Sequence, residues 1–287
     1  MGSSSMRSGH ALLALAVAFT LVIAPRAAAQ GLGAERRVQA GSTTLQVFVA
    51  GQGKGAVLLP SLGRGAEDFA DLSKRLVAAG HRVILPQPRG IGASTGAMAE
   101  LTLHDYANDI AAVIRGVSAD AVTIVGHAWG NRLARMVATD HPDLVERLVL
   151  VAAGGRAPAS PDIGQALDRA FDLSLPKPDH LAAVAKAFFA PGNDPAVWDG
   201  GWHPKTKQAQ QAASRATPVD SWWAGGSVPI LVLQGANDVT APPANGELLL
   251  KEFGHRVTLV TVTGAGHALL PEQPAFIADT LIAWLKR

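Results

Sequence analysis

Short apolar runs alternate with amphipathic stretches along most of the chain. Most of the apolar runs are continuous, which is typical of strands covered on both faces of a parallel sheet. We expect strands at residues 44–50, 56–59, 82–85, 121–125, 147–151, 229–233 and 256–262. Apolar positions at helical spacing predict helices at residues 69–79, 103–115, 131–139, 244–253 and 275–285. Because strand and helix alternate, we predict an α/β fold with a doubly wound, mostly parallel sheet, and an antiparallel pair near residues 37–50.

One segment, residues 156–227, interrupts this alternation and contains no convincing strand. It carries helix-like stretches at residues 162–173, 179–190 and 205–216, and four of the six tryptophans of the chain. A structureless loop of this length is uncommon inside a domain. We therefore predict an inserted helical cap at residues 156–227, on a core formed by residues 30–155 and 228–287.

The first residues have the pattern of a secretory signal peptide. Arg7 and His10 precede an apolar run at residues 11–24, and three alanines at residues 27–29 precede Gln30. The run is shorter than the roughly 20 residues that cross a bilayer. We expect residues 1–29 to be removed, which leaves a secreted or periplasmic protein with no membrane span. A retained N-terminal anchor is the alternative.

Composition narrows the classes of function. Without Arg7 and Arg26, basic and acidic residues number 23 each, which gives no support for a nucleic-acid or acidic-membrane partner. The absence of cysteine excludes disulfides, thiolate nucleophiles and cysteine-ligated metals. The chain has no H-E-x-x-H motif, no dinucleotide fingerprint and no phosphate loop, so we expect no metal and no organic cofactor. A small molecule is the expected partner, and the oligomeric state stays open.

Three motifs follow one another in a recognisable order. Residues 125–131, V-G-H-A-W-G-N, join a strand to a helix; Asp238 follows the strand at 229–233; and His267 lies in a glycine-flanked loop after the last strand. This order of elbow, acid and histidine resembles the α/β-hydrolase superfamily over nearly all of the chain after residue 29. The resemblance is to capped bacterial esterases and dehalogenases. It implies that His267 is the general base, that Asp238 is its acid partner, and that residue 128 occupies the nucleophile position.

The resemblance also implies an oxyanion hole. One donor would be the backbone N–H of Trp129 and the second that of Leu62, in a loop where Pro60-Ser61 replaces the His-Gly pair common in relatives. Ser61 and His127 are further candidates for contacts to the oxyanion or substrate. Arg64 in the same loop either binds an anionic group or is a solvated loop residue, and we favour the second interpretation.

The nucleophile position holds Ala128, which cannot attack a substrate. Alanine is either native, or a replacement of serine, or a replacement of aspartate, since G-H-D-W-G is typical of haloalkane dehalogenases. In a dehalogenase, Trp129 and a tryptophan of residues 156–227 would hold the halide through indole N–H groups. Epoxide-hydrolase chemistry is disfavoured because the only tyrosine, Tyr106, lies outside that segment. We favour native alanine because the leader is present and because neighbouring positions, Asn131 among them, also depart from the serine-hydrolase pattern.

With native alanine no acyl-enzyme forms at residue 128, but a dyad of His267 and Asp238 could still activate water. We predict an exported hydrolase of a small, largely uncharged ester- or lactone-like substrate, with low or water-mediated activity. The tryptophans and sparse charge of residues 156–227 are the basis for an uncharged substrate. The alternatives are a non-catalytic small-ligand-binding pseudo-hydrolase, and a nucleophile knockout of a serine esterase or haloalkane dehalogenase.

Overall fold

An eight-stranded sheet forms the centre of the structure, a computed structural model that describes residues 1–2 and 31–287. The strand order is β1-β2-β4-β3-β5-β6-β7-β8. β1 pairs antiparallel with β2 and β2 with β4, whereas the remaining neighbours pair in parallel. The strands are β1 (Ala34–Ala40), β2 (Thr43–Ala50), β3 (Gly55–Leu59), β4 (Arg82–Pro86), β5 (Val122–His127), β6 (Val145–Val151), β7 (Ile230–Gly235) and β8 (Val257–Val262). The predicted doubly wound, mostly parallel α/β sheet is confirmed.

Helices follow the strands as the apolar spacing predicts. The helices outside residues 156–227 are α1 (Ala70–Ala78), α2 (Leu103–Val117), α3 (Trp129–Asp140), α7 (Ala244–Phe253) and α8 (Pro274–Leu285). Every residue of β5 and β7 is buried. Because both faces of these strands are covered, their sequences are mostly apolar rather than alternating. The main core joins the sheet to α2, α3 and α7, while α1 and α8 pack against each other and contact β4 and β7 respectively.

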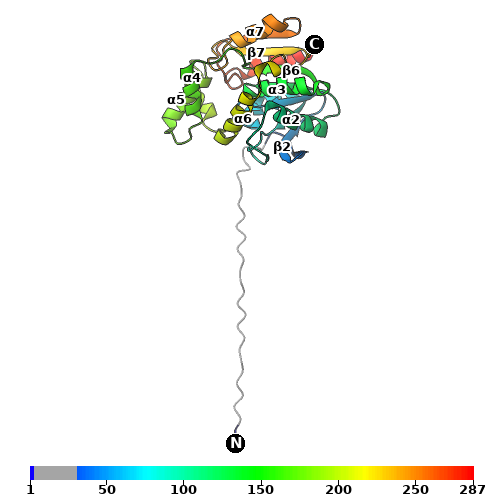
Figure 1. Cartoon of the computed structure of the whole chain (residues 1–287), viewed down its shortest axis with the longest axis vertical. Coiled ribbons are helices and arrows are strands. Elements are labelled where there is room, and N and C mark those ends of the chain that lie inside the picture. The colour runs from blue at the N-terminus through cyan, green and yellow to red at the C-terminus, as the bar shows by residue number, and fades with distance from the viewer. Residues whose placement is uncertain (3–30) are drawn as a thin grey trace. The chain divides into compact units, whose positions relative to one another are not determined.

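The segment between β6 and β7 contains three α-helices, α4 (Pro161–Ala170), α5 (Lys177–Phe188) and α6 (Pro204–Ala216). α4 and α5 pack together and lie at one side of the molecule, whereas α6 lies close to α2 (Figure 1). Trp198 and Trp202 belong to the apolar cluster that joins α4 and α5. Trp222 and Trp223 instead lie in the main core. All four tryptophans are therefore packing residues.

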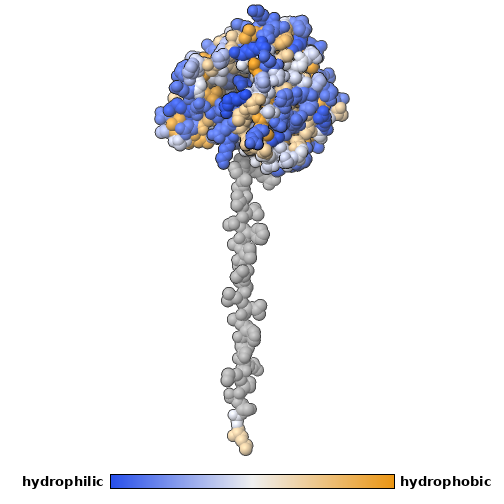
Figure 2. Space-filling view, in the orientation of Figure 1, coloured by the Kyte–Doolittle hydropathy of each residue, from blue (hydrophilic) through white to orange (hydrophobic). Residues whose placement is uncertain are grey.

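Two predictions concern a signal peptide and the absence of a membrane-spanning segment. The signal peptide predicted at residues 1–29 lies, apart from residues 1 and 2, outside the described residues. Among residues 1–2 and 31–287, no helix has the length and apolar character needed to cross a bilayer. Apolar side chains are scattered over the face drawn in Figure 2 rather than gathered into one patch.

Candidate functional site

The turn between β5 and α3 forces residue 128 into an uncommon backbone conformation. Ala128 has φ 50° and ψ −108°, a region that residues with a Cβ rarely adopt. A side chain at Gly130 would overlap the carbonyl of Leu59, and one at Gly126 would overlap the backbone of Gly130 and Asn131. The chain therefore needs glycine at both positions to make so sharp a turn. The turn brings residue 128 to the carboxyl end of the parallel strands, where open α/β sheets place their sites.

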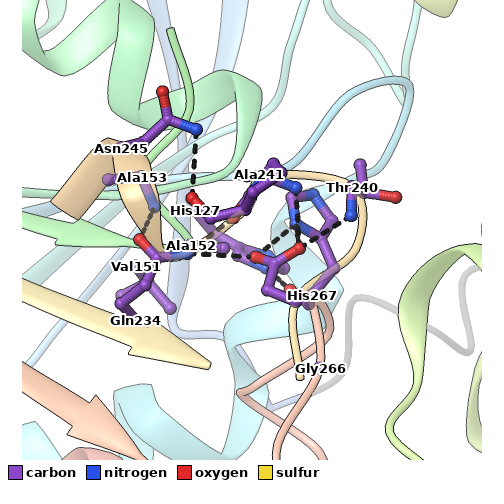
Figure 3. Close-up of polar contacts among 12 residues, drawn as sticks. His127, Val151, Ala152, Ala153, Gln234, Thr240, Ala241, Asn245, Gly266 and His267 are labelled. Atoms are coloured by element: carbon purple, nitrogen blue, oxygen red, sulfur yellow. Dashed lines mark hydrogen bonds and ion pairs between the residues drawn. The ribbon is translucent and has the colours of Figure 1, made fainter. Parts of the chain in front are cut away.

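His267 and Asp238 are in direct contact at this end of the sheet. The Nδ1 of His267 lies 2.9 Å from Oδ2 and 3.1 Å from Oδ1 of Asp238, and both side chains are buried. Figure 3 shows the imidazole of His267 beside the loop that carries Thr240 and Ala241. The sequence-predicted pair is therefore brought together, and its catalytic role stays a prediction.

Hydrogen bonds fix the carboxylate and, through it, the tautomer of the histidine. The backbone N–H groups of Thr240 and Ala241 donate to Oδ1 of Asp238 at 3.0 and 2.7 Å, and Nε2 of Gln234 donates to Oδ2 at 3.3 Å. A carboxylate offers only acceptor oxygens, so Nδ1–H of His267 donates the hydrogen bond to it. The lone pair of that imidazole then lies on Nε2, where it can act as a base.

The loop that carries Asp238 and the loop that carries His267 both form hydrogen bonds with the end of α5. Ala268 N–H donates to the carbonyl of Phe188 at 2.8 Å, and the hydroxyl of Thr240 donates to the carbonyl of Ala187 at 2.6 Å. The carboxylate of Glu272 accepts the N–H of Ala190 and of Gly266 at 2.7 and 2.8 Å. Burial raises the pKa of Glu272, and these N–H donors oppose that shift. Residues 156–227 thus help to hold the histidine in place.

A cavity of about 400 Å³ opens beside the dyad. Of the predicted site residues, Ser61, Leu62, Ala128, Trp129 and His267 line it, while Asp238 lies behind the histidine. No acceptor among residues 31–287 takes a hydrogen bond from the backbone N–H of Leu62 or of Trp129. The Nε2 of His267 also makes no hydrogen bond to any described residue. The cavity thus joins the imidazole of His267, Ala128 and the two residues, Leu62 and Trp129, that carry these backbone N–H groups.

His127 differs from the expectation that it contacts the oxyanion or substrate. Its ring is fully buried outside the cavity lining, and its Nε2–H donates to the backbone carbonyl of His267 at 2.8 Å. No described residue bonds to its Nδ1. Burial, followed by the charge of a protonated His267, lowers the pKa of His127 to about 3. We therefore assign it to positioning the loop of His267, because the last residue of β5 points into the core beneath the elbow.

This buried histidine predicts a loss of stability in acid. Its pKa is 6.5 in the unfolded chain and about 3 in the folded one, so the unfolded state binds the extra proton between these values. Stability is full above pH 6.5 and falls as the pH drops towards 3, by about 2 kcal/mol between pH 6.5 and 5. Urea unfolding of the wild type and His127→Gln at both pH values measures this loss. The variant should lose less stability than the wild type; equal losses would exclude His127 as the cause.

Arg64 is not the solvated loop residue that we favoured. It is 3% exposed, its guanidinium pairs with both carboxylate oxygens of Asp68, and it stacks on the rings of Trp198 and Trp202 at 4.2 and 4.6 Å. The loop folds beneath residues 156–227, which a reading of local sequence does not show. Because its charge is already paired inside the molecule, Arg64 is also excluded as the binder of an anionic substrate.

The halide site expected of a dehalogenase is likewise absent from the described residues. The indole N–H of Trp129 donates to the carbonyl of Gln210 and the hydroxyl of Ser214, which ties α3 to α6. That of Trp202 donates to the carbonyl of Trp198. None of the four tryptophans between residues 156 and 227 lines the cavity. This arrangement removes the structural basis for the aspartate-knockout alternative.

Sequence reasoning missed three residues that support or line the site. Gln234, near the end of β7, joins Asp238 to the N–H of Ala153. The carboxylate of Glu272 accepts a hydrogen bond from the loop that carries His267. Arg132 lines the cavity. Arg132 could have been found, because it follows Ala128 by four residues and so lies on the same face of α3. Gln234 and Glu272 have no comparable local signal, since their partners come from distant loops.

The geometry agrees with comparisons to known proteins. The family model described as "Alpha/beta hydrolase family" matches residues 56–280. The chain belongs to this family. A Variovorax paradoxus protein assigned as the carbamate hydrolase RutD is 27% identical over 254 residues, which cover 81% of this chain and 92% of that protein.

Other relatives match less of their own length or show the fold alone. An uncharacterised protein of Mycobacterium tuberculosis is 34% identical over 107 residues, 37% of this chain, and the match spans about a third (31%) of that relative's length. An esterase from Exiguobacterium antarcticum has a TM-score of 0.75 at 21% identity and covers 88% of this chain and 99% of its own. A bromoperoxidase from Bacillus anthracis has a TM-score of 0.73 at 19% identity, with coverage of 88% and 100%.

Proposed function

We propose that this member of the alpha/beta hydrolase family hydrolyses an ester, lactone or related carbonyl compound by direct attack of water. The observation that carries the proposal is the cavity shared by the imidazole of His267, the methyl of Ala128 and the residues of the two backbone donors. We also propose that the protein acts after export, as residues 1–29 indicate, and that residues 156–227 cap the site.

The proposed reaction uses the imidazole of His267 and the backbone N–H groups of two residues that line the cavity. The Nε2 of His267 takes a proton from water, whose oxygen bonds to the substrate carbonyl carbon while the C=O electron pair moves onto oxygen. The N–H groups of Leu62 and Trp129 stabilise the negative charge on that oxygen. The C=O bond then re-forms, the bond to the leaving oxygen breaks, and the proton on His267 passes to that oxygen. The products are an acid and an alcohol, and the histidine is neutral again.

The missing nucleophile limits how fast such a site can work. In serine proteases, removal of the nucleophile lowers turnover on the order of a millionfold, and the remaining groups stay about 10³–10⁴ above water. A specialised substrate that positions its own carbonyl beside the water would offset part of this loss. A ligand-binding protein without turnover is the second candidate, favoured only by the alanine itself. The hydrogen-bonded dyad favours the enzyme.

A panel of esters, lactones and haloalkanes given to the mature protein and to His267→Ala tests the proposal. We expect slow turnover of a carbonyl substrate by the wild type, and a rate equal to that in buffer for the variant. The contaminant control is Asp279→Asn, an exposed residue of α8 purified in parallel, which should match the wild type. Turnover that survives His267→Ala, or saturable binding with no turnover of any panel member, would contradict the water-activation mechanism.

A further inference from the structure

The charged side chains that line the cavity, apart from His267, are all basic. Arg132 comes from α3 and Arg215 from α6, and no aspartate or glutamate belongs to the lining among residues 31–287. Arg132 makes no ion pair and no hydrogen bond with any described residue. Within residues 31–287 its guanidinium contacts one aromatic ring, that of Trp222, whose centroid lies 5.8 Å from the guanidinium carbon. A half-buried guanidinium without an anionic partner is unusual, because desolvation of a charge is costly unless it is paired.

A second arginine behind the cavity wall adds to this positive charge. Arg135 is fully buried, donates to the side-chain and backbone oxygens of Asn131 and to the carbonyl of Gly154, and stacks on Trp222 and Trp223. Its Nη1 has no partner among the described residues. Burial lowers the pKa of both Arg132 and Arg135, and the charge of Arg132 lowers that of Arg135 further. Neither arginine forms an ion pair with an aspartate or glutamate among the described residues.

The free guanidinium lies near the dyad. A carbon built onto Gly154 would lie 3.7 Å from Nη2 of Arg132 and 3.5 Å from Cβ of Ala241. The N–H of Ala241 is one of the donors that hold Asp238. Arg132 and the acid loop thus meet across Gly154, and Arg132 follows Ala128 by one helical turn. A small molecule with two functional groups can reach both the guanidinium and the base.

We propose that the substrate carries a carboxylate, or a carboxylate-like anion, that binds Arg132, with Arg215 as a second cation, while its hydrolysable carbonyl lies beside His267. This inference rests on the proposed hydrolase function and names its substrate class. The planar fork of arginine matches the two oxygens of a carboxylate. The proposal replaces the expectation of an uncharged substrate. That expectation rested on the tryptophans and the sparse charge of residues 156–227, but these tryptophans do not line the cavity and Arg215 does.

Two esters of equal acyl length test the charge preference. 4-Nitrophenyl hydrogen glutarate carries a carboxylate where 4-nitrophenyl valerate carries a methyl group. We expect kcat/KM to favour the charged ester by about tenfold or more, and Arg132→Met to lower its kcat/KM about 10- to 100-fold, mainly through KM. The neutral ester should change less than about twofold, and Arg132→Lys should fall between. Arg169→Met, an exposed arginine of α4 outside the cavity, is the matched control.

A binding measurement separates this inference from the hydrolase proposal. Calorimetry with the glutarate dianion, in the wild type, His267→Ala and Arg132→Met, needs no turnover. Binding to the first two proteins but not the third supports the anion site even if neither ester is hydrolysed, in which case the hydrolase proposal alone fails. Hydrolysis of both esters at equal kcat/KM, with no glutarate binding, overturns the anion site and leaves the hydrolase proposal standing. Tighter binding of inorganic phosphate than of glutarate would overturn the carboxylate assignment.

Discussion

Replacing Ala128 with serine is expected to raise ester hydrolysis by about 100-fold or more. The backbone at residue 128 already has the positive φ of a nucleophile elbow, so serine adds one hydroxyl without new strain. That hydroxyl would enter the cavity that His267 lines, where Nε2 is without a partner among the described residues. The base, the acid and the backbone donors would then complete a nucleophile triad. The measurement is kcat on a 4-nitrophenyl ester for the wild type and Ala128→Ser, with the burst of an acyl-enzyme as its signature.

The double variant Ala128→Ser/His267→Ala is the control for this gain. It should return the rate to that of His267→Ala alone, because a serine without its base is a weak nucleophile. A serine variant that gains less than about tenfold, although it is folded and binds the ester, would show that residue 128 and His267 are not aligned for attack. Such a result would count against assigning this turn as a nucleophile position.

The elements of the site that could be predicted from the sequence are those with a local signature. Gly126 is required by a backbone contact within the turn and Gly130 by the close approach of Leu59 on β3, and both glycines stand within the same five residues of the sequence. Asp238 lies in the loop after β7, which is buried throughout, and His267 lies in the loop after the edge strand β8. The carboxyl ends of parallel strands share one edge of the sheet. Their meeting therefore follows from the fold, and the fold follows from the alternation of strands and helices.

Side chains whose neighbours come from distant segments could not be predicted in this way. Arg64 stands in a loop and His127 at the end of β5, at positions that look solvent-facing or cavity-facing in the sequence, but both side chains are buried. The tryptophans of residues 156–227 could equally line a cavity or fill a core. The packing of α4 on α5 buries Trp198 and Trp202, and the main core buries Trp222 and Trp223. The charge of the cavity could not be predicted either, because it depends on which arginines form no ion pair with an aspartate or glutamate from a distant segment.

Asn131 and Arg135 connect the first turn of α3 to the loop after β6. Asn131, which stands where relatives often carry glycine, is fully buried, donates to the carbonyl of Ala152 at 2.8 Å, and accepts from Arg135 at 2.6 Å. The side chains of Asn131 and Arg135 thus connect the first turn of α3 to the loop after β6. A site with alanine at its elbow and matched neighbours is consistent with native alanine.

Replacing Asp238 with asparagine is expected to abolish most of the remaining turnover. The N–H groups of Thr240 and Ala241 both point at Oδ1, so the amide oxygen of asparagine would face them and its NH₂ would face His267. The Nδ1 of His267 must then accept a hydrogen bond, which moves the proton to Nε2 and removes the base. We expect kcat to fall on the order of 10³–10⁴-fold, as it does when a triad histidine is held in the wrong tautomer.

The loss should be measured in the Ala128→Ser background as well as in the wild type, so that a slow native rate does not hide it. Asp279→Asn, the same substitution at an exposed position of α8, controls for the chemistry of the change. Raising the pH should not restore the rate, because the fault is the placement of a proton on neutral imidazole rather than its ionisation. A fall of less than tenfold in a folded protein would mean that Asp238 does not set the tautomer, and that His267 is not the base.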